Sequence, residues 1–149
     1  MSARNVWRVV ALTALVACSG SGEPSTDQLL KELVLRRDAW TQRGITSYEY
    51  DYLTTGFFTN IAGQKIHLVV RNGVVESGTV VSTGQPIANP AQWPTIDRLF
   101  ATATAAASSN ELRSLEFDSG LDYPTQIGLD GPPDASGTVY ASSLVAQSP

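Results

Sequence analysis

The chain has 149 residues, of which 42% are hydrophobic and 16% charged, and its formal net charge at pH 7 is −4. This length suits one domain rather than two, and the hydrophobic content is sufficient for a folded core. The acidic balance, without a basic cluster, argues against a nucleic-acid partner, because phosphate binding needs a concentrated positive surface. The single cysteine excludes an internal disulfide.

The chain begins with a pattern typical of a secretory signal. Arg4 and Arg8 precede an apolar run over residues 9–17 that only Thr13 interrupts. A membrane-spanning helix needs about 20 apolar residues, so this run is too short to be one. The order of positive charge, apolar run and small residues instead indicates export.

The end of this run resembles the lipobox of bacterial lipoprotein signals, with Leu15, Val16 and Ala17 before Cys18. The resemblance implies a diacylglyceryl group on the Cys18 thiol, cleavage before this residue, and fatty acyl chains such as palmitate holding the protein on a membrane of the cell envelope. The alternatives are a plain secretory signal with an incidental cysteine, or an uncleaved anchor. We expect residues 1–17 to be the signal peptide, 18–26 a flexible tether rich in Gly and Ser, and 27–149 the domain.

The domain is expected to open with a helix over residues 28–43, capped by Asp27 or Thr26. Gly44 fits the left-handed position that follows many helices. The spacing places five apolar side chains on or beside the buried face, namely Leu29, Leu33 and Trp40, with Leu30 and Val34 widening the stripe.

A first strand is expected over residues 45–58, because tyrosines alternate with acidic residues there. Tyr48, Tyr50 and Tyr52 then share one face, and Glu49 and Asp51 share the other. Three aromatic rings on one face suit either a core or a platform for a ligand, and we favour the core.

Asn72-Gly73 is the strongest hairpin signal in the chain and favours a type I′ turn between strands at 65–71 and 74–81. In that register Val70 faces Val75 and Leu68 faces Ser77. His67 then lies on the less buried face, near Glu76, in what we interpret as a surface charge pair.

The second half of the chain is expected to contain a loop, a second helix and further strands. The proline-containing loop 84–94 displays Trp93, either as a lid over the core, which we favour, or as a recognition edge. Thr95 caps a helix that runs to Ala107. Strands are expected at 112–117 and 125–129, with an edge strand at 138–144. We therefore predict an α+β fold: an N-terminal helix, a three-strand antiparallel meander, a second helix and two or three further strands, with the helices packed on one sheet face.

The order of these motifs resembles a family of bacterial secreted or lipid-anchored proteins with a domain of unknown function, over roughly residues 33–144. The matching residues are Trp40, Gly44-Ile45, Ser47-Tyr48-Glu49-Tyr50, Val70-Arg71-Asn72-Gly73-Val74-Val75, Pro94-Thr95-Ile96-Asp97, Leu99-Phe100, Phe117-Asp118, Tyr123-Pro124-Thr125-Gln126-Ile127 and Asp130. The resemblance implies a fold and an envelope location, and it supplies no catalytic residues. Similar proteins often carry a cysteine pair after the first strand; this chain has Gly56-Phe57-Phe58 there, so no redox role carries over.

The sequence offers little for catalysis. His67 is the only histidine, no Gly-x-Ser-x-Gly motif is present, and no glycine-rich loop leads into a helix with a Lys-Ser or Lys-Thr end. Glu49, Asp51 and Glu76 are candidates for paired carboxylates on a strand face. Calcium is the most plausible metal, since four aspartates border two turns, but such residues are ordinary in turns. These are Asp118, Asp122, Asp130 and Asp134.

We therefore expect a non-enzymatic, envelope-anchored binding module with no cofactor and no metal, and with an envelope protein as its partner. The alternatives are a small-ligand carrier with an aromatic pocket and, less favoured, a carboxylate-based enzyme. The residues assigned to the partner or ligand surface are Tyr48, Tyr50, Tyr52, Phe57, Trp93, Glu49 and Glu76.

Overall fold

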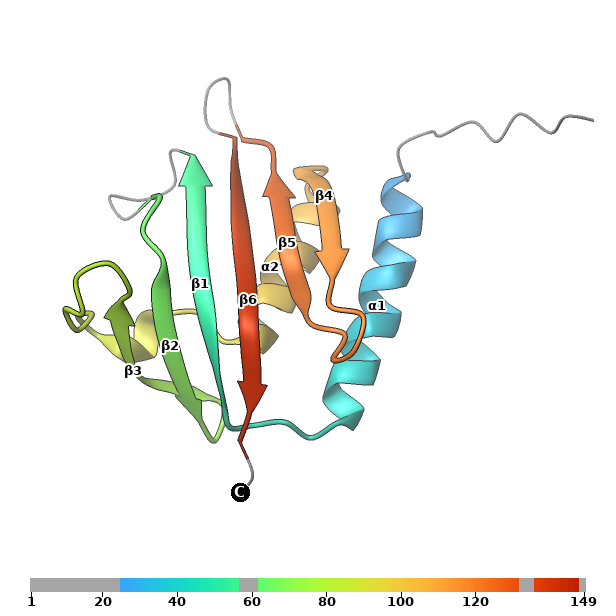
Figure 1. Cartoon of the computed structure of the whole chain (residues 1–149). Coiled ribbons are helices and arrows are strands. Elements are labelled where there is room, and N and C mark those ends of the chain that lie inside the picture. Colours follow the sequence, from blue (N-terminus) through green and yellow to red (C-terminus); the bar gives the residue numbers. More distant parts are fainter. Residues whose placement is uncertain (1–24, 57–61, 132–135, 148–149) are drawn as a thin grey trace, which may run out of the picture.

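The structure, a computed structural model, describes residues 25–56, 62–131 and 136–147. Six antiparallel strands form one sheet, and two α-helices lie on one of its faces (Figure 1). The predicted α+β fold is therefore confirmed. The elements in chain order are α1 (Thr26–Gln42), β1 (Tyr48–Gly56), β2 (Ile66–Arg71), β3 (Val74–Val80), the short 3₁₀ helix η1 (Pro90–Gln92), α2 (Ile96–Ser108), β4 (Leu112–Phe117), β5 (Pro124–Leu129) and β6 (Gly137–Ala146).

The strands are ordered β3-β2-β1-β6-β5-β4 across the sheet. The expected meander β1-β2-β3 is present, but β6 is not the expected edge strand. It lies in the centre, paired antiparallel with β1 on one side and with β5 on the other. The chain passes behind the sheet through α2 before it builds β4 and β5, and β6 then fills the gap beside β1 (Figure 1). Central placement buries Val139 and Ala141 of β6 in the core.

The N-terminus of α1 is fixed by Ser25, rather than by Thr26 or Asp27. The Ser25 hydroxyl accepts a hydrogen bond from the backbone N–H of Gln28 (3.4 Å), and the Gln28 side chain accepts one from the backbone N–H of Ser25 (3.0 Å). This reciprocal pair is a capping box, and it starts the helix two residues earlier than expected. At the other end Gly44 has φ +63°, which the predicted left-handed stop requires.

The buried face of α1 is narrower than the sequence suggested. Leu29, Leu33 and Trp40 are buried as expected, but Val34 is 57% exposed. The reason is the position of α1, which packs against α2 and against the edge strand β4 instead of crossing the middle of the sheet (Figure 1). A helix at an edge has fewer neighbours to cover a wide apolar stripe.

Two tyrosines of β1 join the sheet to the start of α2. Tyr48 and Tyr50 are fully buried on the helix-covered face. The Tyr48 hydroxyl accepts a hydrogen bond from the backbone N–H of Ile96 (2.8 Å), and the Tyr50 hydroxyl donates one to the carbonyl of Pro94. Thr95 lies between Pro94 and Ile96 and caps the helix, as predicted. Its hydroxyl accepts a hydrogen bond from the backbone N–H of Arg98 (3.3 Å). The strand therefore sets where α2 begins.

The β2–β3 hairpin forms around Asn72 and Gly73, whose φ values of 49° and 76° are both positive, as a type I′ turn requires. Val70 faces Val75 as predicted. Beyond that pair the register shifts, so Leu68 faces Gly78 and not Ser77. Glu76 is the extra residue of this β-bulge.

Candidate binding site on the open sheet face

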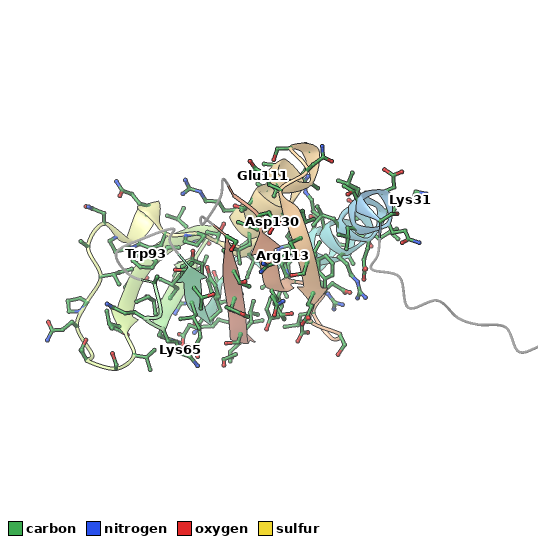
Figure 2. All side chains as sticks on the ribbon, turned by 90° about the horizontal axis from the view of Figure 1, so that it is seen from above. Lys31, Lys65, Trp93, Glu111, Arg113 and Asp130 are labelled. Atoms are coloured by element: carbon green, nitrogen blue, oxygen red, sulfur yellow. The ribbon has the colours of Figure 1, made fainter. Side chains whose placement is uncertain are left out.

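One face of the sheet carries no helix. Figure 2 shows Lys65 on this side, opposite the side occupied by α2. Because strand side chains alternate between faces, β1 presents Glu49, Asp51 and Leu53 here while its tyrosines enter the core. The face is therefore polar near β2 and carries both polar and apolar side chains toward β6. Two features on this face are candidates for a functional site.

The first feature is a row of alternating basic and acidic side chains across β1 and β2, which we call the charge ladder. It consists of Lys65, Asp51, His67, Glu49 and Arg71. His67 lies at its centre, with Nδ1 3.0 Å from Oδ1 of Asp51 and Nε2 3.3 Å from Oε2 of Glu49. Lys65 Nζ lies 3.8 Å from Oδ2 of Asp51, and Arg71 NH2 lies 3.6 Å from Oε1 of Glu49. Gln147 also donates a hydrogen bond to Glu49 from the end of β6.

The expected pairing of His67 with Glu76 is wrong. His67 faces Thr79 on β3 and Asp51 on β1, and both of its ring nitrogens contact carboxylates of β1. The β-bulge explains the difference, since it inserts Glu76 as an unpaired residue and moves it along the strand away from His67. Glu49, Asp51 and Glu76 accordingly do not form one carboxylate cluster.

The second feature is a depression of about 550 Å³, which we call the open-face groove. It crosses β1, β6, β5 and β4, and it shares Asp51 and Lys65 with the charge ladder. A second register shift, between β1 and β6, accompanies a positive φ of 58° at Ser143, which lines the groove. The other lining residues are Leu53, Glu116, Asp118, Tyr123, Thr125, Gln126, Tyr140, Ala141 and Ser142.

The three carboxylates of the groove differ in their partners. Asp51 contacts His67 and Lys65. Asp118 accepts hydrogen bonds from the backbone N–H groups of Gly120 (2.9 Å) and Leu121 (2.7 Å), so it shapes the β4–β5 turn. Glu116 is exposed and has no ion pair within the part of the chain that the structure describes. It is therefore the groove carboxylate that is available to a partner.

Tyr123 closes one end of the groove and is buried. Burial, with a smaller contribution from the nearby charge of Asp118, raises the pKa of the Tyr123 phenol above its ordinary value.

The aromatic residues expected to form a partner or ligand surface are not brought together. Tyr48 and Tyr50 belong to the core, which corrects their assignment to such a surface. Tyr52 packs edge-to-face on Trp93, with ring centroids 5.9 Å apart, and the two line a separate open pocket of about 260 Å³ with Gln92 and Pro94. Phe57 lies outside the described residues, so its assignment stays a prediction.

The loop that contains Trp93 packs on the sheet as the expected lid. The Trp93 indole N–H donates a hydrogen bond to the carbonyl of Ala88 (3.3 Å), and its ring is half-buried against the core. A bridge between Thr79 and Pro86 attaches the beginning of the loop to the edge strand β3. The Trp93 side chain is therefore partly buried in the structure.

The three aspartates considered for calcium that the structure describes have other partners. Asp122 lies between Arg36 (2.7 Å) and Arg43 (2.6 Å), and hydrogen bonds from these two guanidinium groups lower the pKa of its carboxyl. Asp130 lies 3.7 Å from Arg113. Asp134 lies outside the described residues. Among the residues that are described, no group of three or more His, Cys, Asp or Glu side chains is arranged to hold a metal.

Sequence reasoning missed most of the groove, because Gln126, Tyr140 and Ser142 come together only when β6 lies between β1 and β5. In the sequence these residues alternate with the buried Ile127, Val139 and Ala141. That alternation indicates which side chains share the open face, but only once the pairing of β6 with β1 and β5 is known. The lipobox residues and Cys18 lie before the described residues. No helix within 25–56, 62–131 or 136–147 has the length and hydrophobicity to cross a membrane.

The fold and the groove define an α+β protein with one helix-covered and one open sheet face. The sequence matches a family of unknown function, DUF6174, over residues 32–143, and the chain belongs to that family. The match begins within α1 and covers the rest of that helix, the whole of α2 and all of the sheet apart from the end of β6. Comparison with curated proteins gave no match, and comparison with solved structures gave none either.

Proposed function

We propose that this protein is a lipid-anchored binding module of the bacterial cell envelope, and that its open-face groove holds a polar segment of an envelope protein. The observation that carries this proposal is the groove itself. A depression of about 550 Å³ falls within the usual size of ligand sites, and its lining offers hydroxyl, amide and carboxylate groups along four strands.

The envelope location rests on the N-terminal sequence. An acylated Cys18 would carry two or three chains, and each buried methylene contributes about 0.8 kcal/mol to membrane binding, so the anchor would be firm. The segment between Cys18 and Ser25 is short and rich in Gly and Ser. A domain on such a tether can present its groove to a neighbouring protein while it remains at the membrane.

A binding role is favoured over catalysis because of how the groove carboxylates are used. A general acid or base must exchange protons with a substrate, whereas Asp51 is held by two basic side chains and Asp118 by two backbone N–H groups. Glu116 remains, and a single exposed carboxylate suits recognition of a basic side chain. The carrier alternative is weaker, because the Tyr52–Trp93 pocket of about 260 Å³ is open and small for a drug-sized ligand.

The groove is tested by a charge reversal, Glu116→Lys. Detergent-solubilised envelope is passed over the acylated protein, and bound proteins are identified by mass spectrometry. We expect one defined protein to be captured and to be lost with Glu116→Lys. The matched control is Glu111→Lys, which makes the same charge change at an exposed residue outside the groove (Figure 2). Equal capture by both variants would remove the groove from the proposal.

The anchor is tested separately by intact-mass spectrometry of protein purified from native membranes. We expect a chain that starts at Cys18 and carries the added mass of a diacylglyceryl group, with or without a further acyl chain. A free thiol, or a chain that retains residues 1–17, contradicts the anchor and leaves the groove test unaffected.

A further inference from the structure

Helix α1 exposes apolar side chains that no part of the described protein covers. Val34 is 57% exposed and Leu35 is 69% exposed. Together with half-buried Leu30 and the stem of Lys31 they line a shallow depression of about 470 Å³ on the outer side of the helix. We call these four residues the α1 patch.

The α1 patch stands out from the rest of the surface. The other large hydrophobic residues that are exposed in the described chain lie singly, namely Val74 on β3, Val81 just after β3 and Val145 on β6. Single exposed apolar residues are ordinary on soluble proteins, whereas adjacent ones on a helix mark an interaction surface. Figure 2 shows Lys31 on the side of α1 away from the sheet, so the patch faces outward from the molecule.

We propose that the α1 patch rests on the lipid bilayer to which Cys18 attaches the protein. This inference builds on the proposed function, because it uses the acylated cysteine. Its basis is the length of chain between the lipid and the helix. Seven residues, 18–24, precede Ser25, and even fully extended they span only about 25 Å.

The tether therefore keeps α1 close to the membrane at all times. A random coil of seven residues rich in Gly and Ser has a root-mean-square end-to-end distance of about 15 Å. The bilayer is then present at a high effective concentration, so a contact too weak to bind a free protein becomes populated. A second copy of the chain has no such advantage, because it must arrive by diffusion.

The charged side chains around the α1 patch limit how deeply the patch can enter the bilayer. Lys31 can place its methylene stem among the apolar side chains while its ammonium group meets lipid phosphates. Asp27 lies four residues before Lys31, and Asp38 lies four residues after Val34, and both are exposed. These carboxylates must stay in water, so the contact is limited to the interface and does not reach the acyl-chain interior.

This orientation leaves the open-face groove accessible. The groove is on the sheet face opposite α2, whereas the α1 patch points outward from the helix beside the edge strand β4 (Figures 1 and 2). The bilayer would thus fix one side of the molecule without covering the site proposed to bind a partner.

The experiment uses full-length acylated protein with Val34→Cys, labelled with an environment-sensitive fluorophore and reconstituted in vesicles of phosphatidylethanolamine and phosphatidylglycerol. Some of the lipids carry a nitroxide quencher high on the acyl chain. The matched control is Val74→Cys, which exchanges an equally exposed valine at the β2–β3 hairpin, at the opposite edge of the sheet from α1 (Figure 1). We expect quenching several-fold stronger at position 34 than at position 74.

Equal quenching at the two positions overturns the inference. Energy transfer between two copies labelled at position 34, at a low protein-to-lipid ratio and without lipid quenching, also overturns it and assigns the patch to a dimer. Adding Leu35→Gln to the protein labelled at position 34 is expected to reduce the quenching. Failure of the anchor is recognised independently, because the intact mass would then show an unmodified Cys18.

Discussion

The two faces of the sheet use the same alternating strands for different purposes. On the helix-covered face, Tyr48 and Tyr50 are fully buried and each hydroxyl has one defined partner near the start of α2. On the open face, the alternating residues Glu49 and Asp51 contact the ring nitrogens of His67, and the side chains of all three are partly exposed to water. The comparison shows that the pleat of one strand places buried packing on one face and solvent-accessible polar contacts on the other. Contacts on the buried face are expected to be worth much more than contacts of similar geometry on the open face, because solvent screens the latter.

The largest effect is expected from the buried face. Trp40 packs edge-to-face on Tyr48 (5.6 Å between centroids) and on Tyr123 (6.4 Å), and it joins α1 to the sheet. Trp40→Ala should lower the free energy of unfolding by about 4 kcal/mol, since it leaves a large cavity. Urea denaturation followed by circular dichroism measures this. Val34→Ala, an exposed truncation on the same helix, should change the value by less than about 0.5 kcal/mol.

The second prediction compares the same chemical change on the two faces. Tyr50→Phe leaves the Pro94 carbonyl without its donor in a partly buried site, which should cost about 1.5 kcal/mol of stability. Tyr140→Phe removes a hydroxyl from the open-face groove and should cost less than about 0.5 kcal/mol. If the two variants have equal stability in urea, the contrast between the faces is wrong.

The same tyrosines predict a dependence on alkaline pH. Burial raises the pKa values of Tyr48 and Tyr50 above those of exposed tyrosines. A group with a raised folded pKa contributes stability that is complete below its unfolded pKa and is lost as pH rises above it, here above about pH 10. The unfolding free energy should therefore be nearly constant below about pH 9 and fall progressively as the pH rises above about 10. A Tyr48→Phe and Tyr50→Phe double variant should show a shallower fall.

An ion pair at the edge of the buried region should have an intermediate effect. Asp122 lies between Arg36, which is in α1, and Arg43, which directly follows α1. The two ion pairs connect the β4–β5 turn to this helix. Asp122→Asn should cost about 1 kcal/mol at neutral pH. Because the folded pKa of Asp122 is lowered, its contribution is complete above the unfolded value of about 3.9 and is lost progressively as pH falls from there through the folded pKa.

That acid dependence supplies the check on Asp122. Thermal or urea unfolding of the native protein and the Asp122→Asn variant should differ at neutral pH and converge below about pH 3, beneath the unfolded pKa. A difference that persists unchanged in acid would mean that packing at the turn, rather than the charge of Asp122, holds these elements together.

The smallest effect is expected in the charge ladder. His67→Gln removes the central member, but the side chains around it are partly exposed, so the loss should stay below about 1 kcal/mol and shrink with added salt. Urea titrations at low and high salt measure this. A loss as large as that of Tyr50→Phe would show that the open face also holds the fold together, and it would break the separation of the two faces.

Local chemistry made parts of the fold predictable. Thr95 before an apolar helical repeat predicted the N-cap of α2, and Asn72-Gly73 predicted the hairpin turn, because both signals act within a few residues. Errors arose where the outcome depended on distant segments. Ser142 was assigned to an edge strand, and His67 was paired with Glu76, because neither the pairing of β6 nor the bulge in β3 has a strong local signal.

The candidate site was even less predictable than the fold. Glu49 and Asp51 were correctly placed on the face opposite the tyrosines, because alternation along one strand is visible in the sequence. The groove itself draws Glu116, Gln126 and Tyr140 from three strands of the C-terminal half. Their proximity follows from strand order, which no single stretch of sequence contains.

The sequence by itself determined the helices, the strands, the alternation of tyrosine and carboxylate, and a lipoprotein-like N-terminus. Each of these depends on neighbours within a turn or a strand, where backbone geometry fixes which side chains share a face. The tertiary structure alone decided that β6 lies beside β1, that Val34 is exposed, and that a groove crosses the open face. These depend on which distant segments pack together, and burial of the whole apolar surface selects that arrangement only when the complete chain has folded.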